Sequence, residues 1–309
     1  MERKVIQQRQ AFGEALLKVG KTRDDIVVLD ADVGTTTKVS LFGDEFPDRF
    51  FQAGIAEANM VSMAAGFATT GKVAVTAAFS YFLSSRVVDQ IRSICYANLN
   101  VKFVGTHGGV SPTVDGASHH ALTDLAHMRC LPNMTVLCPG DPKETEEAVE
   151  EMLKINGPVY LRLSRNECTQ VMDKGKFQFG KARVITEGRD VTLVSTGVMI
   201  ERTLLAAEKL RDEGLRVGVI HAGTIKPFDA NTLRNAAQST KAILTIEEHN
   251  IIGGLGSAVA ESIASGANCK FDRIGIQDTY TRSGGYEELL DLYGLSVDNI
   301  VKKATDIVK

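Results

Sequence analysis

Short apolar runs that alternate with helical stretches limit the possible folds of this chain more than any other feature. The first run, at 26–30, reads Ile-Val-Val-Leu-Asp, and further runs lie at 73–77, 101–105, 135–138 and 159–163. Helical patterns lie between them, at 9–19, 57–69, 82–96 and from about 142 to 155. Apolar strands joined through helices are typical of parallel sheets covered on both faces. We therefore predict an α/β fold.

The same pattern repeats after a charged, loop-like stretch at about 166–189. Strand-like runs follow at 191–195, 216–220 and 242–246, with a helix at 200–213 and another opened by Gly253-Gly254-Leu255-Gly256. With 309 residues, the chain is long enough for two ordinary domains. The prediction is two consecutive parallel-sheet α/β domains, at 1–170 and 190–309, joined by a linker at 171–189.

Composition excludes several classes of function. Hydrophobic residues make up 44% of the chain, which is enough for an ordinary core. The net charge is −3, and the sequence has no basic stripe that would indicate nucleic-acid binding. No apolar stretch approaches the ~20 residues that span a membrane. The five cysteines are scattered without a Cys-x-x-Cys pair, and no signal-like apolar run opens the chain. We therefore expect a reduced, cytoplasmic protein with neither nucleic acid nor membrane as a partner.

An acid, an aromatic cluster and two histidine-bearing loops follow one another in the first predicted domain. Glu57 stands among small and apolar residues at a predicted helix start. Ligand sites of open α/β sheets lie at the carboxyl ends of strands, so residues that follow the strands are candidates for such a site. These are Phe79, Tyr81 and Phe82, then His107-Gly108-Gly109, then Asp115-Gly116-Ala117-Ser118-His119-His120.

This order meets the needs of thiamine diphosphate. The cofactor is activated when a buried carboxyl group hydrogen-bonds N1′ of its aminopyrimidine ring, and aromatic side chains pack against that ring. Burial raises the pKa of a carboxyl group, which favours sharing a proton with a ring nitrogen. Glu57 could supply that group. Taken singly, however, such a glutamate more often stabilises a helix dipole, such aromatic residues more often belong to a core, and a loop histidine is usually solvated.

Together these motifs resemble the C-terminal half of transketolase, a thiamine diphosphate enzyme, from about residue 5 to 300. The resemblance implies a pyrimidine-binding domain followed by a transketolase C-terminal domain. The matching segments are Asp30-Ala31-Asp32-Val33, Gly54-Ile55-Ala56-Glu57, Phe79-Ser80-Tyr81-Phe82, Thr106-His107, Asp115-Gly116-Ala117-Ser118-His119 and Leu163-Ser164-Arg165. In the second domain, Glu247-Glu248-His249-Asn250 with the glycine-rich segment after it is similar to 1-deoxyxylulose-5-phosphate synthase and its relatives.

The resemblance implies a cofactor-binding role for five residues. Glu57 would activate the pyrimidine ring, and Phe79 and Phe82 would pack on it. Asp32 and Ile55 would line the same cleft, where a bulky apolar residue could hold the cofactor in its bent form.

The resemblance also implies a site for a phosphorylated sugar. His119 would bond the carbonyl oxygen of the donor or transfer a proton, and Asp115 would hydrogen-bond a sugar hydroxyl. His107, Arg165 and Arg9 would bind the substrate phosphate, because a planar guanidinium matches that anion. Arg165 could instead form a surface ion pair, and Arg9 could lie on a solvated helix face. The implied catalytic set is Glu57 with His107 and His119.

The implied activity is the transfer of a two-carbon ketol unit from a ketose phosphate to an aldose phosphate, as in pentose phosphate metabolism. In this family Mg²⁺ and the diphosphate bind at a Gly-Asp-Gly motif with a downstream asparagine. Here Gly43-Asp44 and Gly140-Asp141 are not followed by glycine. The resemblance therefore implies no metal ligand in this chain, a separate N-terminal subunit that carries the Gly-Asp-Gly motif and binds Mg²⁺, and an α2β2 assembly.

Three departures from transketolase leave the donor and acceptor sugars open. His120 stands where a glutamine is usual, Ser85 stands where an aromatic residue is expected, and His107-Gly108-Gly109 stands in place of a His-Asp-Ser run. The roles of His120 and of Glu247-Glu248-His249 also stay open.

Several alternatives remain beside transketolase. They are a subunit of the 1-deoxyxylulose-5-phosphate synthase type, the β subunit of a 2-oxo-acid dehydrogenase, and a non-catalytic paralogue. The dehydrogenase subunits lack the Asp-Gly-x-Ser/Thr-His loop, and the presence of Glu57, His107 and His119 together argues against a non-catalytic paralogue. A dinucleotide-binding protein would need Gly-x-Gly-x-x-Gly at the first strand–helix turn, which this sequence lacks.

Overall fold

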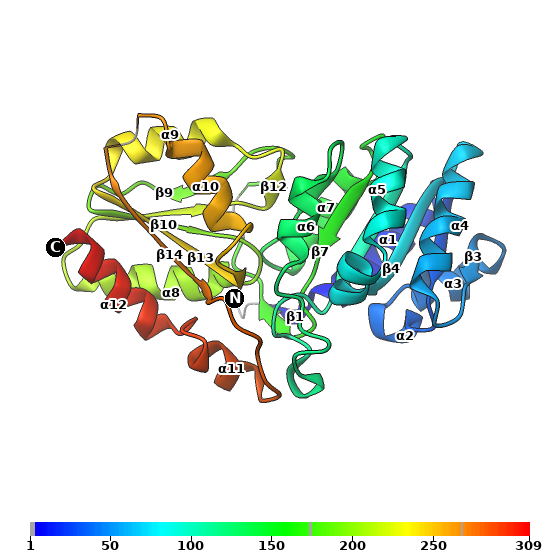
Figure 1. The fold of residues 1–309 in the computed structure, drawn as a ribbon, viewed down its shortest axis with the longest axis horizontal. Helices are drawn as coiled ribbons and strands as arrows, with labels where there is room; N and C mark the ends of the chain where they lie inside the picture. Colours follow the sequence, from blue (N-terminus) through cyan, green and yellow to red (C-terminus); the bar gives the residue numbers. More distant parts are fainter. Residues whose placement is uncertain (1–3, 173–174, 267) are drawn as a thin grey trace.

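The computed structural model describes residues 4–172, 175–266 and 268–309. Its two α/β units lie side by side, with the blue-to-green part of the chain in one and most of the yellow-green-to-red part in the other (Figure 1). Each unit is built on a mostly parallel sheet with helices on both faces. The predicted fold class is confirmed. No helix within the described ranges is long and apolar enough to cross a membrane.

The first sheet has seven strands in the order β12-β6-β7-β5-β4-β2-β3. Neighbouring strands are parallel except at β12 and β6. Every residue of β2 and β7 is buried, because helices cover both faces of the sheet. The strands are β2 (Ile26–Asp30), β3 (Phe50–Gln52), β4 (Val73–Phe79), β5 (Val101–Thr106), β6 (Thr135–Leu137), β7 (Val159–Arg162) and β12 (Thr224–Lys226).

Helices of the first unit pack on the two faces of this sheet. On one face α1 contacts α3 and α7, and on the other α4 contacts α5. Helix α7 begins where Pro142 follows Asp141, whose side chain accepts the Glu144 backbone N–H. The Gly140-Asp141 pair is therefore part of a helix cap. The helices are α1 (Gln8–Gly20), α2 (Gly34–Thr37), α3 (Ser40–Glu45), α4 (Glu57–Thr69), α5 (Val88–Tyr96), α6 (Asp124–Cys130) and α7 (Pro142–Met152).

The second sheet has five strands in the order β14-β13-β10-β11-β9. Neighbouring strands of this sheet are parallel except at β11 and β9. Helices α8 and α12 pack together on one face, and α9 and α10 on the other (Figure 1). The strands are β9 (Arg183–Thr186), β10 (Val191–Ser195), β11 (Val217–His221), β13 (Ala242–Asn250) and β14 (Lys270–Ile276). The helices are α8 (Met199–Asp212), α9 (Ala230–Ser239), α10 (Leu255–Ile263), α11 (Tyr286–Leu292) and α12 (Val297–Val308).

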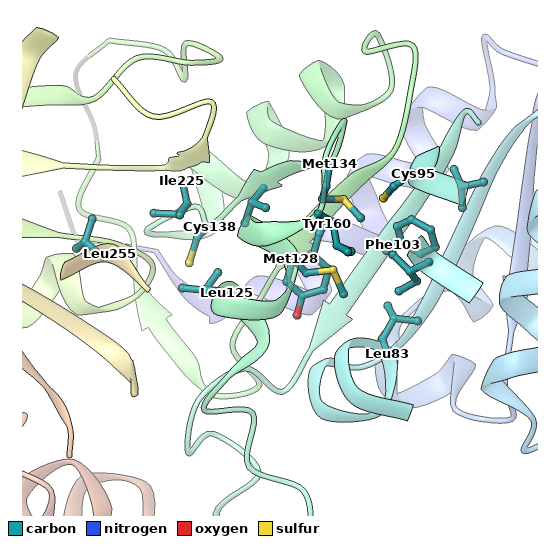
Figure 2. Close-up of a cluster of buried hydrophobic side chains, with 14 of the residues drawn as sticks. Leu83, Cys95, Phe103, Leu125, Met128, Met134, Cys138, Tyr160, Ile225 and Leu255 are labelled. Atoms are coloured by element: carbon teal, nitrogen blue, oxygen red, sulfur yellow. The ribbon is translucent and has the colours of Figure 1, made fainter. Parts of the chain in front are cut away.

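The two units share an apolar core. Strand β12 comes from the second half of the chain but pairs with β6 in the first sheet. Ile225 on β12 and Leu255 on α10 belong to the same buried cluster as Leu125, Cys138 and residues deeper in the first unit (Figure 2). The second unit is thereby packed directly against the segment that carries the predicted histidine loops.

Two expectations about local structure are wrong. The stretch expected as a linker contains β9, which pairs with β11, while residues 173 and 174 of that stretch lie outside the described residues. The helix expected over 82–96 is broken, since a wider π-helical turn spans Phe82–Arg86 before α5 begins at Val88. A short pair that the sequence pattern did not indicate, β1 (Val5–Gln7) with β8 (Glu167–Thr169), joins the chain before α1 to the chain after β7.

Candidate active site

Six of the predicted site residues lie along one edge of the first sheet. Strands β3, β2, β4, β5 and β7 are parallel neighbours, so their carboxyl ends meet at this edge. In sheet order, the residues that end or follow these strands are Ile55 and Glu57 after β3, Asp32 after β2, Phe79 at the end of β4, His107 after β5 and Arg165 after β7.

The loops of Asp32 and Ile55 are tied to each other. Asp32 has a left-handed backbone, with φ of 63°, which is uncommon outside glycine. Its N–H donates to the Gln52 side-chain oxygen at 2.9 Å, and the Gly54 N–H donates to the same oxygen at 3.0 Å. The Gln52 amide in turn donates to Asp30 at 2.7 Å. Ile55 is 78% exposed and Asp32 is exposed as well, so both residues present atoms to solvent at this strand edge.

Four aromatic rings gather at the centre of this edge. The Phe79 and Phe82 rings are 5.8 Å apart between centroids and nearly parallel, with an angle of 18°. His107 stacks on Phe79 at 3.9 Å, and His119 meets the edge of Phe82 at 5.1 Å. Two histidines that are 12 positions apart in sequence thus face the same pair of rings. The structure brings together the predicted aromatic platform and both predicted histidines.

Glu57 is the first residue of α4 and is buried, with 8% of its surface exposed. The Arg86 guanidinium lies 3.7 Å from its carboxylate and 4.0 Å from the centroid of the Phe82 ring. That separation from Glu57 is longer than a hydrogen bond, so the carboxylate keeps lone pairs for a ligand. Arg86 was missed in the sequence, because the π-helical turn that directs it toward Glu57 has no visible signal there.

His107 is held neutral. Its backbone is left-handed, with φ of 62°, and its Nδ1 lies 2.8 Å from the Thr106 hydroxyl. Burial lowers the pKa of His107 to about 3, with further lowering by Arg9, Arg165 and His119. A neutral imidazole offers one N–H and one lone pair, so His107 can bond a polar ligand without carrying charge at neutral pH.

The predicted anion-binding arginines lie beside His107. Arg9 is anchored by bonds to the Gln7 side chain and the Thr36 carbonyl oxygen, each 2.9 Å long. Burial, with help from the nearby Arg165 charge, lowers the pKa of Arg9. Two guanidinium groups that repel each other across a partly buried space are a ready site for an anion.

Asp115 lies beside one of these arginines. Its carboxylate lies 3.5 Å from Arg165, and both side chains are more than a third exposed. Such an exposed pair contributes little stability, so a bound anion can replace Asp115 at Arg165 and leave the carboxylate available for a hydroxyl group.

No group of three or more histidine, cysteine, aspartate or glutamate side chains in the described part of the chain is arranged to hold a metal ion. The polar groups at the strand edge are instead the carboxylates of Asp32, Glu57 and Asp115, two imidazoles and the guanidinium groups of Arg9, Arg86 and Arg165. This set suits an organic ligand with a flat nitrogen heterocycle and an anionic substrate.

The comparisons with known proteins agree with this geometry. Residues 4–170 match the family described as transketolase, pyrimidine binding domain, and residues 180–300 match the transketolase C-terminal domain. The fold and the site therefore define a transketolase-type thiamine enzyme unit, and the chain belongs to the transketolase family.

Individual relatives cover nearly the whole chain. A putative transketolase C-terminal section from Methanocaldococcus jannaschii is 42% identical and is matched over 97% of this chain and 96% of its own length. A 6-deoxy-6-sulfo-D-fructose transketolase subunit, SqwH, from Clostridium sp. is 37% identical over 97% of this chain and 94% of its own. A solved structure described as a split gene transketolase, inactive beta4 tetramer, is 41% identical with a TM-score of 0.89 over 98% of each chain. The chain spans about half of full-length mouse and human transketolases, at 49% of each.

Proposed function

We propose that this chain is the C-terminal subunit of a split, thiamine diphosphate-dependent transketolase, which transfers a two-carbon ketol unit from a ketose phosphate to an aldose phosphate. One observation carries the proposal. The buried Glu57 carboxylate, the paired Phe79 and Phe82 rings and the two histidines meet at one strand edge, in a chain whose halves match two transketolase domains.

The strand edge suits the pyrimidine half of the cofactor. Thiamine diphosphate, when bound, supplies the nucleophilic carbon that takes up the two-carbon unit. Glu57 has lone pairs free to share a proton with a ring nitrogen, and its burial strengthens that hydrogen bond. Phe79 and Phe82 offer flat apolar faces against which an aromatic ring can pack. Asp32 and Ile55, on the adjacent tied loops, would line the remaining side.

The sugar would lie between the histidines and the arginines. His119, close to Phe82, would bond or protonate the oxygen of the reacting carbonyl group, while neutral His107 would bond the terminal phosphate. Arg165 and Arg9 would hold the terminal phosphate, and Asp115 would bond a sugar hydroxyl.

We further propose that the diphosphate and Mg²⁺ are held by a separate N-terminal subunit with a Gly-Asp-Gly motif, in an α2β2 assembly in the cytoplasm. The 41%-identical split-gene relative forms an inactive tetramer of its β chain. By analogy, this chain alone would self-associate without activity.

A sulfonated ketose is a second candidate donor. The 37%-identical Clostridium relative is named for a 6-deoxy-6-sulfo-fructose substrate. A sulfonate is also a tetrahedral, oxygen-rich anion, so the group of Arg9, His107 and Arg165 could bind it as well as a phosphate.

The test combines this chain with its N-terminal partner, thiamine diphosphate and Mg²⁺. We expect ketol transfer from a ketose phosphate to an aldose phosphate only when both chains are present. Release of carbon dioxide from pyruvate by the assembled enzyme would contradict the proposal and favour a synthase or dehydrogenase subunit. A parallel assay with a 6-sulfo ketose separates the two donor classes.

A further inference from the structure

The loop that carries His107 is held from the second unit. Glu248 lies in β13 and is fully enclosed, with 2% exposure. Its carboxylate accepts the Val110 backbone N–H at 2.8 Å and the Tyr286 hydroxyl at 3.0 Å. Gly109 packs so closely on this carboxylate that a Cβ there would overlap it. The His107-Gly108-Gly109 turn is therefore shaped against a side chain of the other unit.

The loop that carries His119 is held from the second unit as well. His120 Nε2 lies 3.1 Å from the Thr113 carbonyl oxygen and Nδ1 lies 2.6 Å from the Thr281 hydroxyl. A carbonyl oxygen only accepts, so Nε2 carries the proton and the Thr281 hydroxyl donates to Nδ1 in the neutral ring. Burial lowers the pKa of His120, which favours this neutral form. A Cβ on Gly116 would come within 2.6 Å of the Ser283 hydroxyl, so the same segment also touches the other end of the loop.

The two loops are hydrogen-bonded to each other. Gly109 and Ala121 exchange a pair of backbone hydrogen bonds of 3.0 and 2.9 Å. Beneath them, Arg162 donates to the Glu248 carbonyl oxygen at 2.8 Å and to the Asp124 carboxylate at 2.8 Å. A displacement of either loop would therefore displace both catalytic histidines.

A hollow of about 260 Å³ borders the second loop. It lies beside His120 and is lined from both units, among others by Tyr81, Leu122, Asn250 and Tyr280. Because His120 is buried yet borders this space, the hydrogen bond with Thr281 adds a directional constraint to the packing of its ring.

We propose that Glu248 and Thr281 are positioning residues of the second unit, which fix the histidine-bearing loops and thereby the placement of His107 and His119 on their substrate. The role rests on the proposed function for its catalytic consequence, but the ordering of the loops is a property of this chain alone. It also gives Glu248 and His120 a function that needs no direct contact with the sugar.

The first measurement is hydrogen exchange by mass spectrometry on the full chain. Thr281→Val removes the hydroxyl and keeps the shape, whereas Thr281→Ser keeps the hydroxyl. We expect peptides from 107–122 to exchange roughly five- to tenfold faster in the valine variant, the effect of losing one hydrogen bond. The serine variant should match the wild type. Thr203→Val, which removes a buried hydroxyl that bonds Met199 within α8, should leave the 107–122 peptides unchanged.

The second measurement is steady-state kinetics of the enzyme assembled with its partner. In Thr281→Val, we expect kcat to fall about tenfold or more while KM for the acceptor changes less than threefold, because misplaced catalytic groups act on the transition state. Thr281→Ser should restore kcat to within about twofold. Glu248→Leu should act in the same direction and Glu248→Gln should restore much of the loss, since an amide oxygen can still accept the Val110 N–H.

Two results would overturn the proposal. One is unchanged exchange over 107–122 in Thr281→Val. The other is faster exchange with unchanged kcat, which would make the contact structural only. If the wild-type assembly shows no ketol transfer, the proposed function fails, while the exchange result still decides whether the second unit orders the loops.

Discussion

At the scale of single residues, the site depends on how buried groups are protonated. Glu57 is buried at a helix start beside a guanidinium group that is too distant to occupy its lone pairs. His107 is buried beside cations and stays neutral. The types and order of these residues are visible in the sequence, but the neutral state of His107 depends on burial and on neighbours such as Arg9 and Arg165 that only the fold brings near.

We expect Glu57→Gln to lower turnover by about 10²–10⁴-fold, since the amide keeps the shape but cannot share a proton with the pyrimidine nitrogen. Folding and assembly should be nearly unchanged. The measurement is kcat of the assembled enzyme, with Glu14→Gln on the exposed face of α1 as a matched control. Retention of more than half of the wild-type activity would show that Glu57 is not the activating group.

Acid should destabilise the fold through His107. Its pKa is about 3 in the folded chain against an ordinary 6.5, so the folded state binds fewer protons between these values. The free energy of unfolding that this neutral ring contributes is present above pH 6.5 and is lost as the pH falls, by roughly 1.4 kcal/mol per unit in the middle of the window and less near pH 6.5.

This effect is measured by urea unfolding of the isolated wild-type chain and of the His107→Asn variant, each at pH 7.5, 6 and 5. The asparagine side chain does not titrate. The difference in unfolding free energy between the two proteins should shrink as the pH falls. A constant difference across the three values would rule out the neutral, buried state of His107.

At the scale of elements, the carboxyl ends of β5 and β7 place His107 and Arg165 next to each other. Arg165→Ala should raise KM for a phosphorylated aldose about ten- to a hundredfold, the cost of one charge-assisted contact. KM for glycolaldehyde, which has no phosphate, should hardly change. Equal losses for both acceptors, measured with the assembled enzyme, would assign Arg165 a structural role instead.

The elements predicted from sequence are those with a strong, continuous pattern. The strands at 26–30 and 191–195 and the helix at 57–69 have the same bounds in the structure. Three-residue strands such as β12 are too short to show a period, and β9 lies at a sheet edge among charged residues. The π-helical turn at Phe82–Arg86 has the composition of ordinary helix, so its extra width, and with it the position of Arg86, could not be predicted.

At the scale of the whole molecule, the second unit is more than an appended domain. The second unit contributes β12 to the first sheet and residues to the apolar core of the first unit. It also hydrogen-bonds both histidine loops through Glu248 and Thr281. Such contacts join residues up to 161 positions apart, so no local pattern in the sequence could indicate them. Of the whole-molecule arrangement, only the two-unit architecture was predictable.

The proposed function requires that this chain supply half of a thiamine diphosphate site. Calorimetric titration of thiamine diphosphate with Mg²⁺ into the chain alone, the N-terminal partner alone and their mixture tests it most directly. We predict micromolar binding in the mixture and none in this chain alone, with weaker binding to the mixture when it contains Glu57→Gln. Micromolar binding by this chain in the absence of the partner would contradict the account.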